Sequence, residues 1–157
     1  MGNVDAQTLD SIEVLRAAQA RLAADQAKQA ELASQADGLD PKAVATVRAM
    51  LDRRIEQARA GVAQATSTVR SERRQLLAER DKLQALIEAE RAEVDTLQLL
   101  RRIGDIDMQQ FNQRIEPIRA AVRKARDDVT RIGARILNMN AELGDESATP
   151  RKARAAS

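Results

Sequence analysis

The side chains of this sequence that could do chemistry are carboxylates and arginines, because it holds no histidine, cysteine, tryptophan or tyrosine. General acid–base catalysis usually relies on histidine, or on a carboxylate whose pKa is shifted by burial in a cleft. The acidic residues that lie close together are Asp127 with Asp128, and the run Glu88, Glu90, Glu93 and Asp95. Helical spacing places most of them on outward faces, where charges are solvated or paired. We therefore expect no catalytic residue among them.

Metal and cofactor sites are not predicted either. Zinc sites need cysteine or histidine, and the di-metal sites of helical bundles need Glu-x-x-His pairs. The six glycines form neither a phosphate-binding loop nor a nucleotide fingerprint, since they lie at the N-terminus, at helix ends or singly inside helices. The sequence thus predicts a protein that is not an enzyme and that binds no metal or cofactor.

Clustered arginines could bind nucleic acid, because contacts to phosphate need only grouped cations. The candidates are Arg53, Arg54, Arg59, Arg70, Arg73 and Arg74, with Arg151, Lys152 and Arg154 in the C-terminal tail. Acidic residues are interspersed among the first group, however, and Phe111 is the only aromatic side chain that could stack on a base. A nucleic-acid-binding accessory protein is therefore the alternative function.

The elements that must position these side chains are helices. Ala, Leu, Ile and Val supply nearly all of the hydrophobic residues, and the chain has six glycines and three prolines, a composition typical of long helices and coiled coils. We predict an all-α fold, an antiparallel coiled coil of three helices within residues 1–144. The expected helices cover about 6–36, 41–103 and 107–143, and a disordered basic tail follows at 145–157.

Two short segments, residues 38–41 and 104–107, end one helix and begin the next. Each contains a glycine that stops a helix, an apolar residue that can form a hydrophobic staple, and an aspartate N-cap. In the second segment, Asp107 and Gln110 have the spacing of a capping box. If the chain reverses at both segments, the start of the first helix and the end of the third meet beside Val69 on the central helix.

The central helix carries a seven-residue repeat, which predicts supercoiling with a partner helix. Its members are Ile55, Val62, Val69, Leu76, Leu83 and Leu97, with Glu90 as the interruption. Glu90 sets the register, pairs with neighbouring arginines or is recognised by a partner. Poor helix formers at 61–68 would allow a kink and a compact four-helix bundle, but no proline or cap marks a stop there. We therefore expect a continuous helix.

The flanking helices differ in the strength of their apolar pattern. The third has two ladders in strict phase, one of them Met108, Ile115, Val122, Val129, Ile136 and Leu143, the other Phe111, Ile118, Ala125, Ile132 and Met139. In the first helix, Leu15 and Leu22 are followed by the smaller or polar inward positions Gln26, Gln29, Ala30 and Ala33. This helix should bury the least apolar area and be the least stable.

Apolar residues beyond the repeat widen one face of the central helix and predict an interaction surface. They are Leu77, Leu86, Ile87, Leu99 and Leu100. The first function that we expect is a non-catalytic scaffold or adaptor that binds a protein partner or itself, as a homodimer or higher oligomer. A second alternative, besides nucleic-acid binding, is a membrane-associated helical hairpin that polymerises.

Charge and hydropathy complete these expectations. Residues 1–40 carry three basic and seven acidic side chains, whereas residues 41–70 carry six basic and two acidic ones, so the first two helices should attract each other. No segment approaches the roughly 18 apolar residues of a membrane span, and the N-terminus lacks a basic leader with an apolar stretch. The expected location is therefore the cytoplasm.

Overall fold

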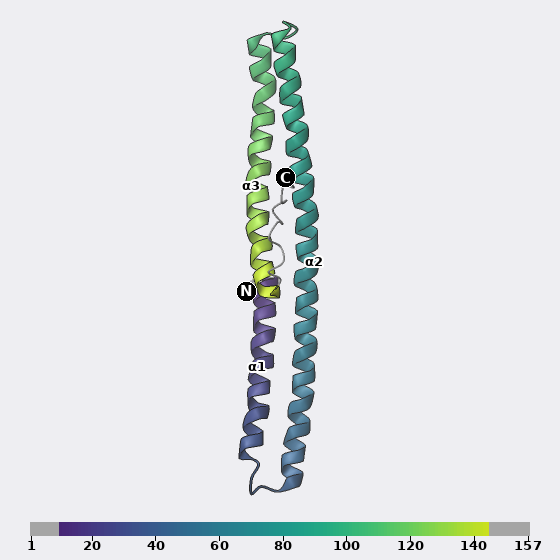
Figure 1. The fold of residues 1–157 in the computed structure, drawn as a ribbon, viewed down its shortest axis with the longest axis vertical. Helices are drawn as coiled ribbons and strands as arrows, with labels where there is room; N and C mark the ends of the chain where they lie inside the picture. The colour runs from purple at the N-terminus through teal and green to yellow at the C-terminus, as the bar shows by residue number, and fades with distance from the viewer. Residues whose placement is uncertain (1–9, 145–157) are drawn as a thin grey trace, which may run out of the picture. The chain divides into compact units, whose positions relative to one another are not determined.

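The structure, a computed structural model, describes residues 10–144 and contains three helices and no strand in that range. Helix α1 spans Ser11–Gln35, α2 Pro41–Arg102 and α3 Met108–Leu143 (Figure 1). The predicted all-α class is confirmed. Within these residues, no helix is long and apolar enough to cross a membrane. The tail at 145–157, predicted to be disordered, lies outside the described residues.

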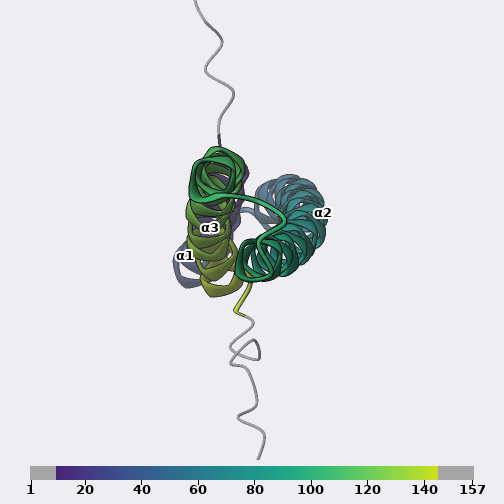
Figure 2. The same ribbon diagram turned by 90° about the horizontal axis from the view of Figure 1, so that it is seen from above.

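The chain divides into two units, which we describe separately. Within the described residues, unit 1 comprises 10–72 with 139–144, and unit 2 comprises 73–138. In unit 1, α1 lies beside the first part of α2, and in unit 2 the rest of α2 lies beside α3 (Figures 1 and 2). Each unit is therefore built on an antiparallel pair of helices.

Helix α1 begins at Ser11, later than the expected start at about residue 6. The backbone of Asp10 is extended, with φ −56° and ψ 137°, so the helix can begin only after it. Its carboxylate accepts a hydrogen bond from the N–H of Ile12 at 3.0 Å, which satisfies a donor that the first helical turn leaves free. Asp10 is thus the N-cap.

The inward stripe of α1 differs from the predicted one. Gln26, Ala30 and Ala33 are exposed, whereas Asp25 is buried. The less exposed positions continue from Leu15 with alternating spacings of four and three residues, and they are Ala18, Leu22, Asp25, Gln29, Leu32 and Ala36. The prediction failed because it placed the polar Gln26 inward in preference to a charged Asp25 that continues the spacing.

Helix α2 is a single helix of 62 residues, about 93 Å long at 1.5 Å per residue. Residues 61–68 are helical throughout, and the Thr68 hydroxyl donates to the carbonyl of Gln64 at 3.1 Å. The hydroxyl therefore bonds within the helix, and the chain continues through these poor helix formers without a stop.

The ladder of α2 that includes Ile55 and Leu97 keeps its seven-residue spacing, but the buried residues beside it change. In unit 1 the companions lie three residues after each ladder position, as Ala58 and Ala65 do. In unit 2 most lie four residues after, as Val94 does, although Leu100 lies three residues after Leu97. The spacing of the less exposed residues on α2 therefore differs between the two units.

The last turn of α3 contacts the first turns of α1 within unit 1. Arg16 Nε donates to Glu142 Oε1 at 2.6 Å, and the Ser11 hydroxyl donates to the carboxylate of Glu72 on α2. The hydrogen bond from Arg16 to Glu142, and then the charge of Glu142, raise the pKa of Arg16 above its ordinary value. Val69 and Met139 in this region have no exposed surface. The predicted meeting of the helix ends near Val69 is therefore confirmed.

The core of unit 2 lies next to its turn. It is a cluster of Leu97, Ile106, Phe111 and Ile115, against which Val94, Leu100 and Ile118 pack. The cluster includes Ile106 immediately before the N-cap of α3 and Phe111 in its first turn, which is the arrangement of a hydrophobic staple. The turn and the first turn of α3 thus contribute two of the four buried side chains of the cluster.

The capping box at the start of α3 forms as predicted. The N–H of Gln110 donates to Asp107 Oδ1 at 2.8 Å, and the N–H of Asp107 donates to Gln110 Oε1 at 3.0 Å. Gly104 takes φ +77°, a left-handed conformation that glycine adopts without steric cost, and ends α2. In the segment between α1 and α2, by contrast, Leu39 is 60% exposed, so a staple formed by Leu39 buries little apolar surface.

Candidate functional site

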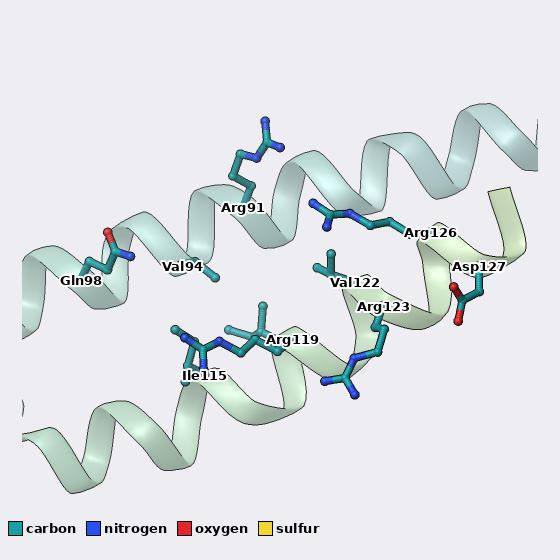
Figure 3. Close-up of a pocket in the computed structure, with 10 residues that line it drawn as sticks. Arg91, Val94, Gln98, Ile115, Arg119, Val122, Arg123, Arg126 and Asp127 are labelled. Carbon is teal, nitrogen blue, oxygen red and sulfur yellow. The ribbon is translucent and has the colours of Figure 1, made fainter. Parts of the chain in front are cut away.

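A groove of about 490 Å³ lies between α2 and α3 in unit 2 (Figure 3). Its apolar part, which we call the floor, consists of Val94, Ile115, Ile118 and Val122. Ile115 is buried, and the other three are half-buried. The polar part, which we call the rim, consists of Arg91, Gln98, Arg119, Arg123, Arg126 and Asp127.

Helical spacing brings the groove residues onto facing sides of the two helices. On α2, Arg91, Val94 and Gln98 are three and four residues apart, so they share one face. On α3 the floor residues belong to the two apolar ladders, and Arg119 and Arg126 are seven residues apart on the flank beside them. The sequence pattern that buries α3 against α2 therefore also places its arginines along one edge.

The rim has a net charge of +3, because it holds four arginines and one aspartate. All four arginines are exposed, and none forms an ion pair or side-chain hydrogen bond with a described residue. Figure 3 shows Arg126 extending from α3 toward α2, while Arg91 points away from α3. A guanidinium is a planar fork of donors that matches a carboxylate or a phosphate. The groove therefore offers anion-binding groups beside an apolar surface.

The five residues of the predicted interaction surface belong to unit 2, in three different environments. Leu86 and Leu99 are 42% and 59% exposed. Leu77 and Ile87 are half-buried, and Leu100 packs against the core cluster. Of the five, only Leu86 and Leu99 are thus exposed enough for a partner to contact them. None of the five lines the groove.

The basic cluster on α2 is only partly neutralised by α1. Arg54 pairs with Asp25 of α1, with 2.7 Å between Nη2 and Oδ1, whereas Arg59 pairs with Glu56 on its own helix at 2.8 Å. Arg53, Arg70 and Arg74 are exposed, and Arg73 is half-buried. The predicted contacts of the tail, at Arg151, Lys152 and Arg154, lie outside the described residues.

The clustered carboxylates also have different surroundings. Asp128 pairs with Arg131 on α3, and Asp127 lies on the groove rim. Glu88, Glu93 and Asp95 are exposed, as expected for solvated faces. Glu90 is half-buried and forms no ion pair with any described residue, so the proposed pairing with neighbouring arginines is wrong.

The Asp25–Arg54 pair is a feature of unit 1 that the sequence analysis missed. Asp25 is 2% exposed, and the side chain of Arg54 is 40% exposed. Asp25 Oδ2 is buried and has no hydrogen-bond partner among residues 10–144. A carboxylate with one unpaired oxygen in the interface between α1 and α2 is costly to bury, so this pair weakens an already thin apolar interface.

The arginines of α3 were missed as well. Only the basic residues at 53–74 and in the C-terminal tail were predicted to bind anions, and Arg119, Arg123 and Arg126 were not among them. A signal was available in the sequence. Arg119 and Arg126 are seven residues apart, and each directly follows a residue of an apolar ladder. Such flanking positions in a helix pair lie at the edge of the interface, where a further helix can reach them.

Comparison with known proteins adds no family to this description. No protein-family model, no curated protein and no solved structure matches the chain. Among residues 10–144, no group of three or more acidic, histidine or cysteine side chains could hold a metal ion.

Proposed function

We propose that this protein is a non-catalytic scaffold or adaptor whose antiparallel coiled-coil helices present a docking groove to another protein. The observation that carries the proposal is the groove of unit 2, with its partly exposed apolar floor and four arginines that pair with no residue of the described range 10–144. Two helices that bury their shared face completely leave no such surface. Recognition of this kind, by a helix laid in an apolar groove, uses anchors at helical spacing.

The coiled-coil part of the proposal is supported by the spacing of buried residues. In α3, Phe111, Ile115, Ala125 and Ile132 are buried at the positions of two heptad ladders. In α1 and α2 the less exposed positions likewise alternate by three and four residues. This spacing is the one that lets side chains of neighbouring helices interlock along a shared axis.

The proposed function is tested by photo-cross-linking in living cells of the source organism. A photoreactive amino acid replaces Gln98 on the groove rim, or Gln113 on the exposed side of α3, which does not line the groove. Both positions are exposed glutamines, so they differ only in location. We expect protein adducts from position 98 that are absent from position 113. Identical adducts at both positions, or none at either, would contradict the adaptor role.

We also propose that the protein self-associates as a homodimer, because large apolar side chains remain exposed outside the groove. Among the described residues these include Leu86 at 42%, Leu99 at 59% and Leu137 at 66% exposure. Light scattering on the intact protein is expected to give twice the chain mass of 17.3 kDa. A mass of one chain at every concentration would remove the dimer from the proposal and leave the adaptor role in place.

A further inference from the structure

We infer that the groove of unit 2 binds an acidic amphipathic helix of a different protein. The inference rests on the proposed adaptor function and adds the chemistry of the partner. It combines two properties of the groove, an apolar floor and a cationic rim, that a single ligand must satisfy together.

The floor selects the apolar part of the partner. Ile115, Ile118 and Val122 on α3 are three and four residues apart, and Val94 faces them from α2. Leucine or isoleucine side chains repeated at the same spacing on a third helix would cover this strip and remove its remaining surface from water. An unfolded polar peptide would leave the strip exposed.

The rim selects the charge of the partner. Arg91 comes from α2, and Arg119, Arg123 and Arg126 come from α3, so arginines of both helices line the groove beside the strip. Glutamate or aspartate flanking the apolar stripe of a third helix would meet these arginines in paired hydrogen bonds. Asp127, beside Arg126, opposes acidic residues at that end, so the partner's carboxylates should concentrate near Arg91, Arg119 and Arg123.

A second copy of this chain fits the groove poorly. Two copies joined groove to groove would bring two surfaces of +3 together, and like charges that face each other across an interface repel. Helix α1 of a second copy carries three acidic and three basic side chains, so it has no net negative charge to match the rim, and Val14 is the only large hydrophobic residue exposed on it among the described residues. It would therefore leave the floor uncovered.

Nucleic acid is also a poorer match. Phosphates could engage the arginines, but they would not use the floor, and the groove has no aromatic side chain on which a base could stack. The combination of floor and rim therefore favours a helix that is apolar on one side and acidic on its flanks.

The test uses two labelled synthetic 21-residue helical peptides with one leucine stripe, flanked by glutamate in the first and by lysine in the second. Binding to the intact protein is followed by fluorescence anisotropy at moderate salt. We expect the glutamate peptide to bind at least about tenfold more tightly than the lysine peptide, and more weakly as salt rises. The double variant Arg119→Glu/Arg123→Glu should reverse this preference.

The matched control is Arg114→Glu/Lys124→Glu, which changes the net charge equally on the same helix. Both of its residues are exposed, and neither lines the groove. It should keep the preference for the glutamate peptide, and circular dichroism should show equal helicity in both variants. The proposal is overturned if neither peptide binds, if both bind equally, or if the two double variants behave alike.

Two further probes separate this partner from other anions. A 21-nucleotide single strand and phosphatidylglycerol vesicles should bind more weakly than the glutamate peptide, and tighter binding of either would overturn the inference. Adducts from position 98 without glutamate-peptide binding would leave the adaptor role standing with a partner of other chemistry. If position 98 gives no adducts and the glutamate peptide does not bind, the adaptor role is contradicted as well.

Discussion

Replacing Leu97 by alanine is expected to lower the free energy of unfolding by about 2–5 kcal/mol. Leu97 is 2% exposed and belongs to the core cluster of unit 2, so the shorter side chain loses its buried contacts and leaves a cavity. Alanine has the highest helix propensity, so the change in α2 itself does not add to the loss. Denaturant unfolding followed by circular dichroism measures the effect.

The matched control for this variant is Leu99→Ala, two residues further along the same helix. Leu99 is 59% exposed, so its truncation should change the free energy of unfolding by no more than about 0.5 kcal/mol. The two variants have the same composition and nearly the same place in α2. An equal loss from both would show that Leu97 does not lie in a packed core.

The second large effect is expected at the buried pair of unit 1, where the two partners should respond with opposite signs. Arg54→Met removes the only ion-pair partner of Asp25 among the described residues and leaves a buried carboxylate unpaired. We expect a loss of about 1–3 kcal/mol in the free energy of unfolding. This loss is smaller than the roughly 3–5 kcal/mol for removing one partner of a fully buried ion pair. The reason is that water reaches Arg54, whose side chain is 40% exposed.

The reciprocal variant Asp25→Leu is expected to raise the free energy of unfolding by about 1–3 kcal/mol. It places an apolar residue at a buried position of α1 and removes an unpaired oxygen, while Arg54 can turn to solvent. The double variant should resemble Asp25→Leu, because Arg54 then has no buried charge to compensate. A destabilised Asp25→Leu protein would show that the pair holds unit 1 together in spite of its burial.

The elements of this fold were predictable where local chemistry decides them. Asp107 with Gln110, and Gly104 before them, form a cap and a stop from residues within one turn of one another, so the sequence alone contains the whole interaction. The strict ladders of α3 were equally clear, because apolar residues repeat there every seven residues without interruption. The helices therefore followed from short-range pattern.

The buried aspartate and the groove were harder to predict because each depends on a neighbouring helix. Asp25 is buried because α2 lies against that face of α1 and supplies Arg54, a partner 29 residues away in sequence. The groove depends on which residues of α2, such as Val94 and Gln98, lie across from Arg119. Periodicity identifies an inward face but does not give the pairing of residues across it.

The division of the chain also bears on its synthesis at the ribosome. Unit 2 is one uninterrupted stretch, so all of it has been made once residue 138 is added. Unit 1 needs the last turn of α3, and the contact from Arg16 to Glu142 joins residues 126 positions apart. Nascent domains generally fold in the order in which they emerge. Here the segment that emerges first completes its tertiary structure last.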